Sequence, residues 1–377
     1  MDFEFSEDQL MLRDSVRRLL AREYSFERRR AILATPHGFS AEIWRLMAQQ
    51  GIFSLALPED VGGYGGPTEI MLVMEELGRG LVLEPFMSTV VIGGGLIRDQ
   101  GTVAQRAQLL PKIATGDCRL ALAHHEAGAR YVLDHVSTLA CRGKGYYVLS
   151  GSKAVIPDAP LADLLIVSAR DDSAGGLSLF LVEPGTPGLA LTAYRTQDGR
   201  SAAGLTLDNV KVPTAARLGS PGVALSALEQ AVDCALAALC AEAVGAMEAL
   251  NESTLQYLNT RKQFGQPIGR FQVLQHRMAD MFLMATQARS MSYLATGRCR
   301  DRDRAQRRHA LSAGKAYVGK AARFLGQQAV QLHGGMGLSA ELPISHYFKR
   351  LTMINATFGD VDHHIGAFSE LLRAQVS

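Results

Sequence analysis

Two short segments in the C-terminal half combine residue types that suit a phosphorylated aromatic cofactor. The first is Arg261-Lys-Gln-Phe-Gly265, and it is followed by a second glutamine, Gln272. The arginine can pair bidentately with a pyrophosphate, while Phe264 offers a flat apolar face. The same residues also suit a helix that ends at a glycine beside a surface charge. Both interpretations remain open on spacing alone.

The second segment is Gln331-Leu-His-Gly-Gly-Met-Gly337, about sixty residues further along. Glycines let a bulky ligand approach the backbone amides, and the side-chain amide of Gln331 can meet a base or a phosphate. A run of glycines is also a common way to end a helix. Taken alone, the helix stop is the simpler interpretation.

Two other clusters contain reactive residue types but do not predict a site. His363 and His364 are adjacent, so we expect their side chains to point apart, and no third ligand is spaced to complete a metal site. Cys234 has no basic neighbour in the sequence that would lower its pKa. We therefore predict no metal site and no cysteine nucleophile.

The elements that must position these segments fall into three blocks. Apolar residues at helical spacing dominate residues 1–118, and short β-type runs separated by turns fill residues 119–222. From residue 223 to 377 the helical pattern returns, with one long helix after Pro221 and others over about 271–296 and 305–332. The pattern predicts a mainly α protein with an inserted β domain. The mixed-charge stretch 298–308 is expected to be a solvated connection between helices.

Composition excludes several classes of function. Lys and Arg total 39 against 37 Asp and Glu, so the net charge of +2 gives no field that would attract nucleic acid. Five cysteines without CxxC spacing favour free thiols in the cytoplasm. The acidic N-terminus is unlike a secretion signal, and the weakly polar stretch Met87–Ile97 is too short to span a membrane. We predict partners other than nucleic acid or membrane.

In this order, RKQFGQPIGRFQ and QLHGGMG resemble the two C-terminal signatures of the acyl-CoA dehydrogenase family, and LTLDNVKVP resembles the end of that family's β domain. The resemblance covers essentially the whole chain. It implies a helical N-terminal domain, a central β-barrel or sandwich domain and a C-terminal four-helix bundle. It also implies FAD, an acyl-CoA substrate and electron transfer to an electron-transfer flavoprotein.

The resemblance also assigns residues. In the family, these signatures contact FAD that is bound mainly by a neighbouring subunit, and the matching positions here are Arg261, Phe264, Gln272, Gln331 and Gly335. The finer resemblance, through CAEAVGAMEAL, TRKQFG and HYFKRLTMINATFGDVDHHI, is to the small subunit of bacterial pimeloyl-CoA dehydrogenases. Such a relative pairs with a larger, related subunit, although a homodimer or homotetramer is also open.

The β-domain signatures depart from the family pattern. Where T-E-P-x-A-G-S-D is usual, the chain has His125 in place of the threonine that bonds the flavin ring. A neutral histidine can still donate or accept one hydrogen bond. Where G-x-K-x-W-I-T/S is usual, Val155 and Pro157 replace the tryptophan and the hydroxyl, and proline lacks even an amide donor. The half-site that should hold the flavin ring is therefore degraded.

The usual catalytic carboxylate is missing as well. Many family members place a Glu before a glycine near the C-terminus, where this chain has Phe358-Gly359, with Asp360 next. The second position used in the family falls on the window 233–235, and Asp233 is its only carboxylate. Asp233 is thus the candidate base for taking the α-proton, unless it is a solvated helix residue; Glu229 and Glu242 fit less well.

Three functions follow. The leading hypothesis is an FAD-dependent acyl-CoA dehydrogenase subunit that desaturates an acyl-CoA, such as pimeloyl-CoA, another dicarboxylyl-CoA or a medium- to long-chain acyl-CoA. A second is a non-catalytic scaffold that keeps the fold for assembly. A third is a flavin oxidase or monooxygenase, which oxygen consumption would reveal.

Overall fold

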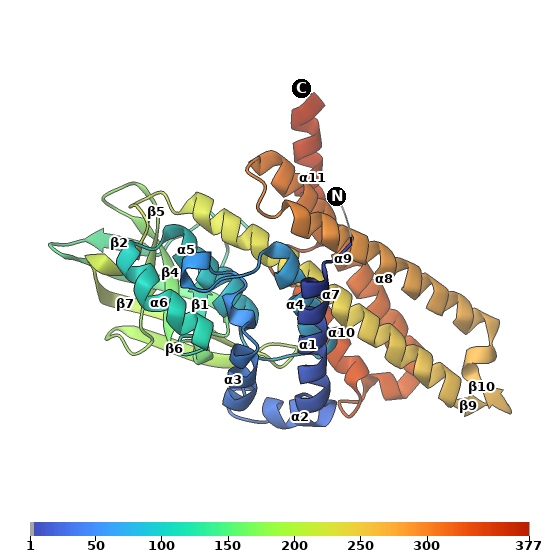
Figure 1. Ribbon diagram of the computed structural model, residues 1–377. Coiled ribbons are helices and arrows are strands. Elements are labelled where there is room, and N and C mark those ends of the chain that lie inside the picture. The colour runs from blue at the N-terminus through green and yellow to red at the C-terminus, as the bar shows by residue number, and fades with distance from the viewer. Residues whose placement is uncertain (1–3, 377) are drawn as a thin grey trace. The chain divides into compact units, whose positions relative to one another are not determined.

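The computed structural model describes residues 4–376 (Figure 1). Contacts divide the chain into two compact units. One unit contains residues 4–29, 67–82 and 236–376, and the other contains residues 30–66 and 83–235. The N-terminal helices expected as one block are therefore shared between the two units.

Short helices occupy the first part of the chain: α1 (Glu7–Glu23), α2 (Phe26–Leu33), α3 (Ala41–Gln49), α4 (Pro67–Arg79), α5 (Gly95–Gln100) and α6 (Val103–Thr115). Capping boxes fix the starts of two of them, Ser6 with Gln9 at α1 and Thr102 with Gln105 at α6. The apolar stretch from Met87 forms a buried π-helix, η3 (Met87–Gly94), which packs on strand β1.

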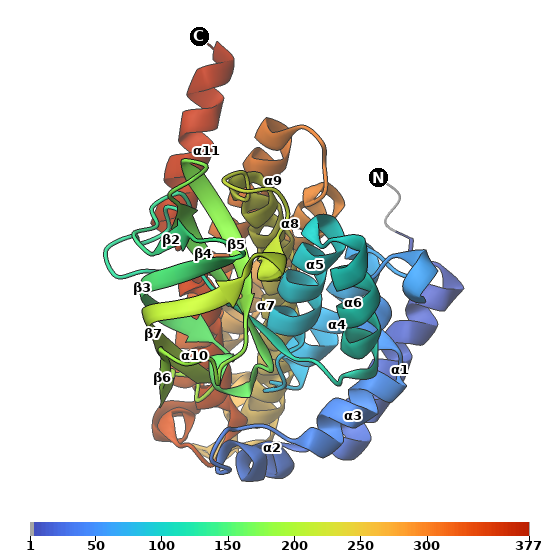
Figure 2. The ribbon, with the colours of Figure 1, turned by 90° about the vertical axis from the view of Figure 1, so that its left-hand side faces the viewer.

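The strands form one eight-stranded sheet in the order β6-β7-β3-β2-β4-β5-β8, with β1 paired to β4 (Figure 2). Their bounds are β1 (Leu120–Ala123), β2 (Leu139–Arg142), β3 (Tyr146–Pro157), β4 (Leu164–Asp171), β5 (Gly176–Val182), β6 (Leu189–Arg195), β7 (Ser201–Pro213) and β8 (Arg217–Leu218). Two pairings, β1 with β4 and β2 with β4, are parallel. All eight of these strands lie between Leu120 and Leu218, so the predicted β domain is confirmed.

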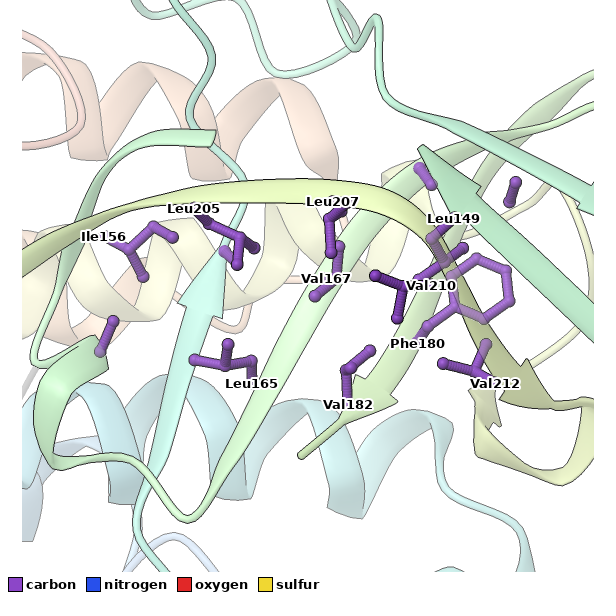
Figure 3. Packing of buried hydrophobic residues seen from close by; sticks show 14 of the residues in the cluster. Leu149, Ile156, Leu165, Val167, Phe180, Val182, Leu205, Leu207, Val210 and Val212 are labelled. Carbon is purple, nitrogen blue, oxygen red and sulfur yellow. The ribbon is translucent and has the colours of Figure 1, made fainter. Parts of the chain in front are cut away.

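The core of the sheet is built from alternate residues of these strands (Figure 3). Leu149, Val167 and Phe180 are fully buried there, and Phe180 packs against the ring of Tyr147 with centroids 5.0 Å apart. β-branched and aromatic side chains suit this pleated, buried surface. The core positions β3, which carries the degraded signature on its other side chains.

Five helices complete the chain: α7 (Leu225–Thr260), α8 (Gln272–Arg298), α9 (Arg304–His333), α10 (Pro343–Ala356) and α11 (Val361–Val376). Helix α7 starts in the unit with the sheet and continues into the other unit, where α9 packs against α8, α10 and α11 (Figure 1). The helical C-terminal bundle is confirmed. The connection after α8 is only partly solvated, because Arg307 is buried and donates to the carbonyl of Asp301 at 2.7 Å.

By length and composition alone, helix α7 could cross a membrane, but 89% of its most apolar 18-residue stretch is buried inside the protein. Core helices have the same length and composition, so these two features are weak evidence for a membrane. All five cysteines are free, as the sequence predicts.

Helices α4 and α7 cross at a pair of glycines. A Cβ atom on Gly78 would lie 2.0 Å from the carbonyl oxygen of Glu242, and one on Gly245 would lie 1.8 Å from the carbonyl oxygen of Glu75. Each helix thus presents a glycine to the backbone of the other. The two backbones approach closely because neither glycine has a side chain.

Candidate cofactor site and its relatives

The first C-terminal segment forms a hairpin beyond the end of α7. Strand β9 (Lys262–Gln263) pairs with β10 (Gln266–Pro267), and Phe264 and Gly265 make the turn with φ values of 54° and 77°. The ring of Phe264 is 89% exposed. Arg261 and Gln272, on either side of the hairpin, are exposed as well. The helix-cap interpretation is incomplete, since the segment presents a cation and an aromatic ring outward.

The second segment ends α9 and continues as the short helix η7 (Gly334–Leu338). Gln331 is exposed, and a Cβ atom on Gly334 or Gly335 would meet nothing within 4 Å. The space beside both glycines is therefore open. A ligand can approach the backbone here without displacing any protein atom, although the amide of Gly334 already donates to the carbonyl of Gln331.

A ring stack joins the ends of the two helices that carry these segments. The ring of Tyr257 on α7 stacks on that of His333 on α9, with centroids 4.3 Å apart and planes inclined by 24°. Arg277 on α8 also donates to Gln328 on α9 at 3.2 Å. The structure therefore brings the two segments together at one end of the helices. The sequence alone did not identify Tyr257 or His333 as the residues that join them.

The β-domain segments present a different surface. His125 is half-buried, and its carbonyl accepts a hydrogen bond from the amide of Ala154 at 2.8 Å. The next residue, Val155, is 42% exposed, and Pro157 is exposed too. Where the family pattern has an indole and a hydroxyl, β3 thus presents two small apolar side chains to solvent.

The signature residues that the chain retains have internal structural roles. Lys153 donates to Glu126 at 2.7 Å and to Ser168 at 3.0 Å, and all three side chains are buried. Ser168 also contacts Nδ1 of His124 at 2.9 Å, and Thr138 donates to Glu126 at 2.6 Å. This network ties β3 and β4 to the segment that carries His125. The chain has kept the buried Glu126 and Lys153 of the signatures, whereas the replaced positions Val155 and Pro157 are exposed.

The network makes a testable prediction for acid stability. Burial alone would raise the pKa of Glu126, but hydrogen bonds from Lys153, Thr138 and the Ser137 amide lower it from 4.5 to about 2. The folded protein thus binds fewer protons than the unfolded chain between these values, so the stability that Glu126 contributes is lost as pH falls from about 4.5 to about 2. Urea unfolding between pH 5 and 3 should show a steeper loss of stability for the wild type than for Glu126→Gln.

The quantity to compare is the slope of the free energy of unfolding against pH, because Glu126→Gln also lowers stability at neutral pH by removing the carboxylate partner of Lys153. Glu59→Gln is the control, since Glu59 is exposed and outside the network. It should keep the wild-type slope. Equal slopes for the wild type and Glu126→Gln would contradict the assignment.

Several residues in or beside the segments compared with the family's signatures have left-handed backbone. Among residues 4–376, six residues other than glycine have positive φ. Arg130, Asn209, Phe264 and Phe358 lie in these segments, and Asp158 directly follows one of them. Left-handed backbone is costly for such residues, on the order of 1 kcal/mol each, and collects at functional sites. Strained backbone at these segments therefore fits a functional role for them.

The carboxylates considered as bases have different surroundings. Asp233 is 4% exposed, so it is not the solvated helix residue that was the alternative. Glu242 is held by Arg350 through two hydrogen bonds of 2.6 and 2.7 Å, which suits a structural ion pair. Asp360 accepts from the amide of His363 at 2.9 Å and so caps α11. Glu229 is buried.

Two expectations about neighbours need correction. The rings of His363 and His364 do not point apart, because their centroids lie 5.0 Å from each other at 81°. Burial lowers the pKa of Arg98, but its hydrogen bond and ion pair with Asp99 and, less strongly, the charge of Cys234 raise it, so Cys234 has a basic group close by in space. Within residues 4–376, no group of three or more His, Cys, Asp or Glu side chains is placed to hold a metal.

Three family profiles match the chain in sequence order. The N-terminal domain of acyl-CoA dehydrogenase matches residues 6–117, the middle domain matches 121–210 and the C-terminal domain matches 221–367. The chain is also 31% identical to acyl-CoA dehydrogenase FadE27 of Mycobacterium tuberculosis, over 82% of each protein. The chain belongs to the acyl-CoA dehydrogenase family. Members of this family are FAD-dependent flavoproteins, and homologues are oxidoreductases.

Two further relatives are named as parts of complexes, and a third is a steroid ACAD. The caffeyl-CoA reductase-Etf complex subunit CarC of Acetobacterium woodii is 28% identical, over 92% of this chain and 93% of CarC. The ChsE4-ChsE5 complex of Mycobacterium tuberculosis has a chain that is 27% identical, with a TM-score of 0.88 and coverage of 100% and 99%. A variant of the Tcur3481-Tcur3483 steroid ACAD is 30% identical, with a TM-score of 0.88 and coverage of 98% and 99%.

The two halves of the chain differ in how well they fit FAD. The C-terminal segments fit: an exposed arginine and ring lie near glycines whose Cβ positions are open. The face of β3 at Val155 and Pro157 does not fit the flavin ring in the family manner, since it has no indole and no hydroxyl there, and proline has no amide hydrogen.

Proposed function

We propose that this chain is one subunit of an FAD-dependent acyl-CoA dehydrogenase that works in a heteromer with a larger, related subunit. FAD bound in the assembly would accept a hydride from the β-carbon of an acyl-CoA thioester. The observation that supports this is the contrast between complete, outward-facing C-terminal segments and a β-domain face that lacks its ring-binding groups. Such a chain is suited to contribute binding residues to a cofactor that its partner subunit mainly holds.

Each C-terminal residue would have a defined task. Arg261 would pair with the pyrophosphate, Phe264 would cover an apolar face of the cofactor, and the amides beside Gly335 would approach its polar atoms. Gln272 and Gln331 would add side-chain amide contacts. The partner would supply the catalytic carboxylate. Asp233 is the candidate base if this chain has an acyl site of its own, and His125 would then contact the flavin ring.

The substrate we propose is an acyl-CoA with a pimeloyl, other dicarboxylyl or medium- to long-chain acyl group. The similarity to a steroid ACAD makes a steroid-derived acyl group a second candidate. We infer that electrons pass to an electron-transfer flavoprotein, which the relative in an Etf complex supports, and that the enzyme is cytoplasmic.

The test compares flavin content with and without a partner. We expect the chain purified alone to lack the visible absorption of flavin, and co-expression with the related larger subunit to give a complex with flavin and acyl-CoA desaturation. Stoichiometric flavin and ordinary turnover in the lone chain would overturn the heteromer. If that occurred, Asp233→Asn would test whether Asp233 is the base.

A second comparison separates the leading function from a scaffold. Arg261→Ala should reduce both the flavin content and the turnover of the complex while its mass stays unchanged. Arg270→Ala is the matched control, because Arg270 is exposed after the same hairpin and is not one of the positions matched to FAD contacts. Full activity of Arg261→Ala would favour a scaffold. Rapid oxygen consumption by the reduced complex would favour an oxidase or monooxygenase.

A further inference from the structure

A cavity of about 470 Å³ lies in the unit that contains the sheet. We propose that it binds a small carboxylate with a compact apolar body. Its lining consists of Thr35, Pro36, His37, Phe39, Arg119, Pro160, Leu161 and Ala162. None of the signature residues discussed above is among them. The volume lies within the ~300–1,000 Å³ that is typical of small-molecule sites.

The polar wall of the cavity is a guanidinium group held in place on two sides. Arg119 donates from Nε to Asp163 at 3.0 Å and from Nη2 to the same carboxylate at 2.9 Å. Its guanidinium carbon also lies 5.1 Å from the centre of the Phe39 ring. Within the described residues Nη1 makes no hydrogen bond, so its two N–H groups are free for a ligand oxygen.

The part of the lining formed by Thr35 and Pro36 is also held in place by hydrogen bonds. Arg195 on β6 donates to the carbonyls of Thr35 at 2.7 Å and Pro36 at 3.0 Å. Gly38, with φ of 61°, allows this clamp, because a Cβ there would lie 2.0 Å from the guanidinium of Arg195. The amide of Leu161 is bonded to the carbonyl of Asp158 at 2.9 Å. Fixed walls reduce the entropy that a ligand loses on binding.

The lining sets the class of ligand. Pro36, Phe39, Pro160, Leu161 and Ala162 are apolar, whereas the polar groups available to a ligand are the donors of Arg119 and the imidazole of His37. No carboxylate is among these lining residues, so a ligand cation would find no partner there. Asp163 offsets the charge of Arg119, which means that a bare inorganic anion gains little. A carboxylate attached to an apolar body can use both kinds of wall.

The experiment is calorimetric titration of the full-length protein with 4-phenylbutyrate and, separately, with inorganic phosphate. We expect saturable binding of 4-phenylbutyrate and much weaker binding of phosphate. Arg119→Met should lower the affinity for 4-phenylbutyrate about tenfold or more, since a charge-assisted hydrogen bond contributes ~1.5–3 kcal/mol. Arg45→Met is the control, because Arg45 is an exposed arginine on α3 in the same unit; its affinity should equal that of the wild type.

Arg119→Met also leaves Asp163 without its partner, so a second variant keeps the ion pair intact. Ala162→Trp places a large side chain at the cavity wall and should abolish binding of 4-phenylbutyrate, with thermal unfolding used to confirm that both variants are folded. The proposal is overturned if 4-phenylbutyrate does not bind the wild type. It is equally overturned if Ala162→Trp binds it with wild-type affinity, or if phosphate binds as tightly.

Discussion

Replacing Arg350 by methionine is expected to lower the free energy of unfolding by about 3–5 kcal/mol, the usual cost of breaking a buried ion pair. Its guanidinium holds the carboxylate of Glu242 through Nε at 2.6 Å and Nη2 at 2.7 Å. Both side chains are at most 10% exposed. Methionine preserves much of the volume but leaves the carboxylate buried without its cation. Urea unfolding of the single variant against the wild type measures the loss.

The double variant Glu242→Leu/Arg350→Met separates the cost of an unpaired charge from the value of the pair. Removing both charges should recover most of the lost stability, because isosteric apolar pairs often replace buried ion pairs at little cost. Glu252→Gln is the surface control, since Glu252 pairs with Arg79 but is 65% exposed. Its effect should stay below about 1 kcal/mol. A double variant as unstable as Arg350→Met would contradict this account.

Gly245→Ala is expected to be the most damaging single-methyl change in the helical unit, with a loss of about 3 kcal/mol or more. The added carbon would lie 1.8 Å from the carbonyl oxygen of Glu75, which belongs to the backbone of α4 and cannot rotate away. Relief requires the two helices to separate. That separation would also disturb the reciprocal contact of Gly78 with Glu242.

Gly366→Ala on α11 is the matched control, because nothing lies within 4 Å of its Cβ position. In open space alanine favours a helix over glycine by up to ~1 kcal/mol, so this variant should be slightly more stable than the wild type. Chemical unfolding of both alanine variants makes the comparison. Equal stability of the two would show that α4 and α7 do not need a glycine at the crossing.

Periodicity was enough to predict the long helices and the main strands, because α7, α8 and α9 and the strands β3, β4, β5 and β7 have strong local patterns. The division of the N-terminal helices between two units was not predictable, since it depends on which buried faces meet. The exposed positions of Arg261 and Phe264 agree with the segment singled out in the sequence. The stack of Tyr257 on His333 could not be seen, because the two residues are far apart in the chain and each fits a helix equally well alone.

The β-domain signatures show a second limit of prediction from sequence. The sequence revealed that Val155 and Pro157 replace the usual residues, but it gave no reason for the survival of Glu126 and Lys153. Their buried network supplies that reason, since losing either one would leave the other charge unpaired inside the sheet.

The left-handed residues beside the β-domain signatures bear on any redesign for unaided flavin binding. Arg130 and Asp158 have left-handed backbone close in sequence to side chains that differ from the family pattern, such as His125, Val155 and Pro157. Under the proposed function, the change to make would be new side chains on β3, since left-handed backbone is costly to introduce, at roughly 1–3 kcal/mol for each residue.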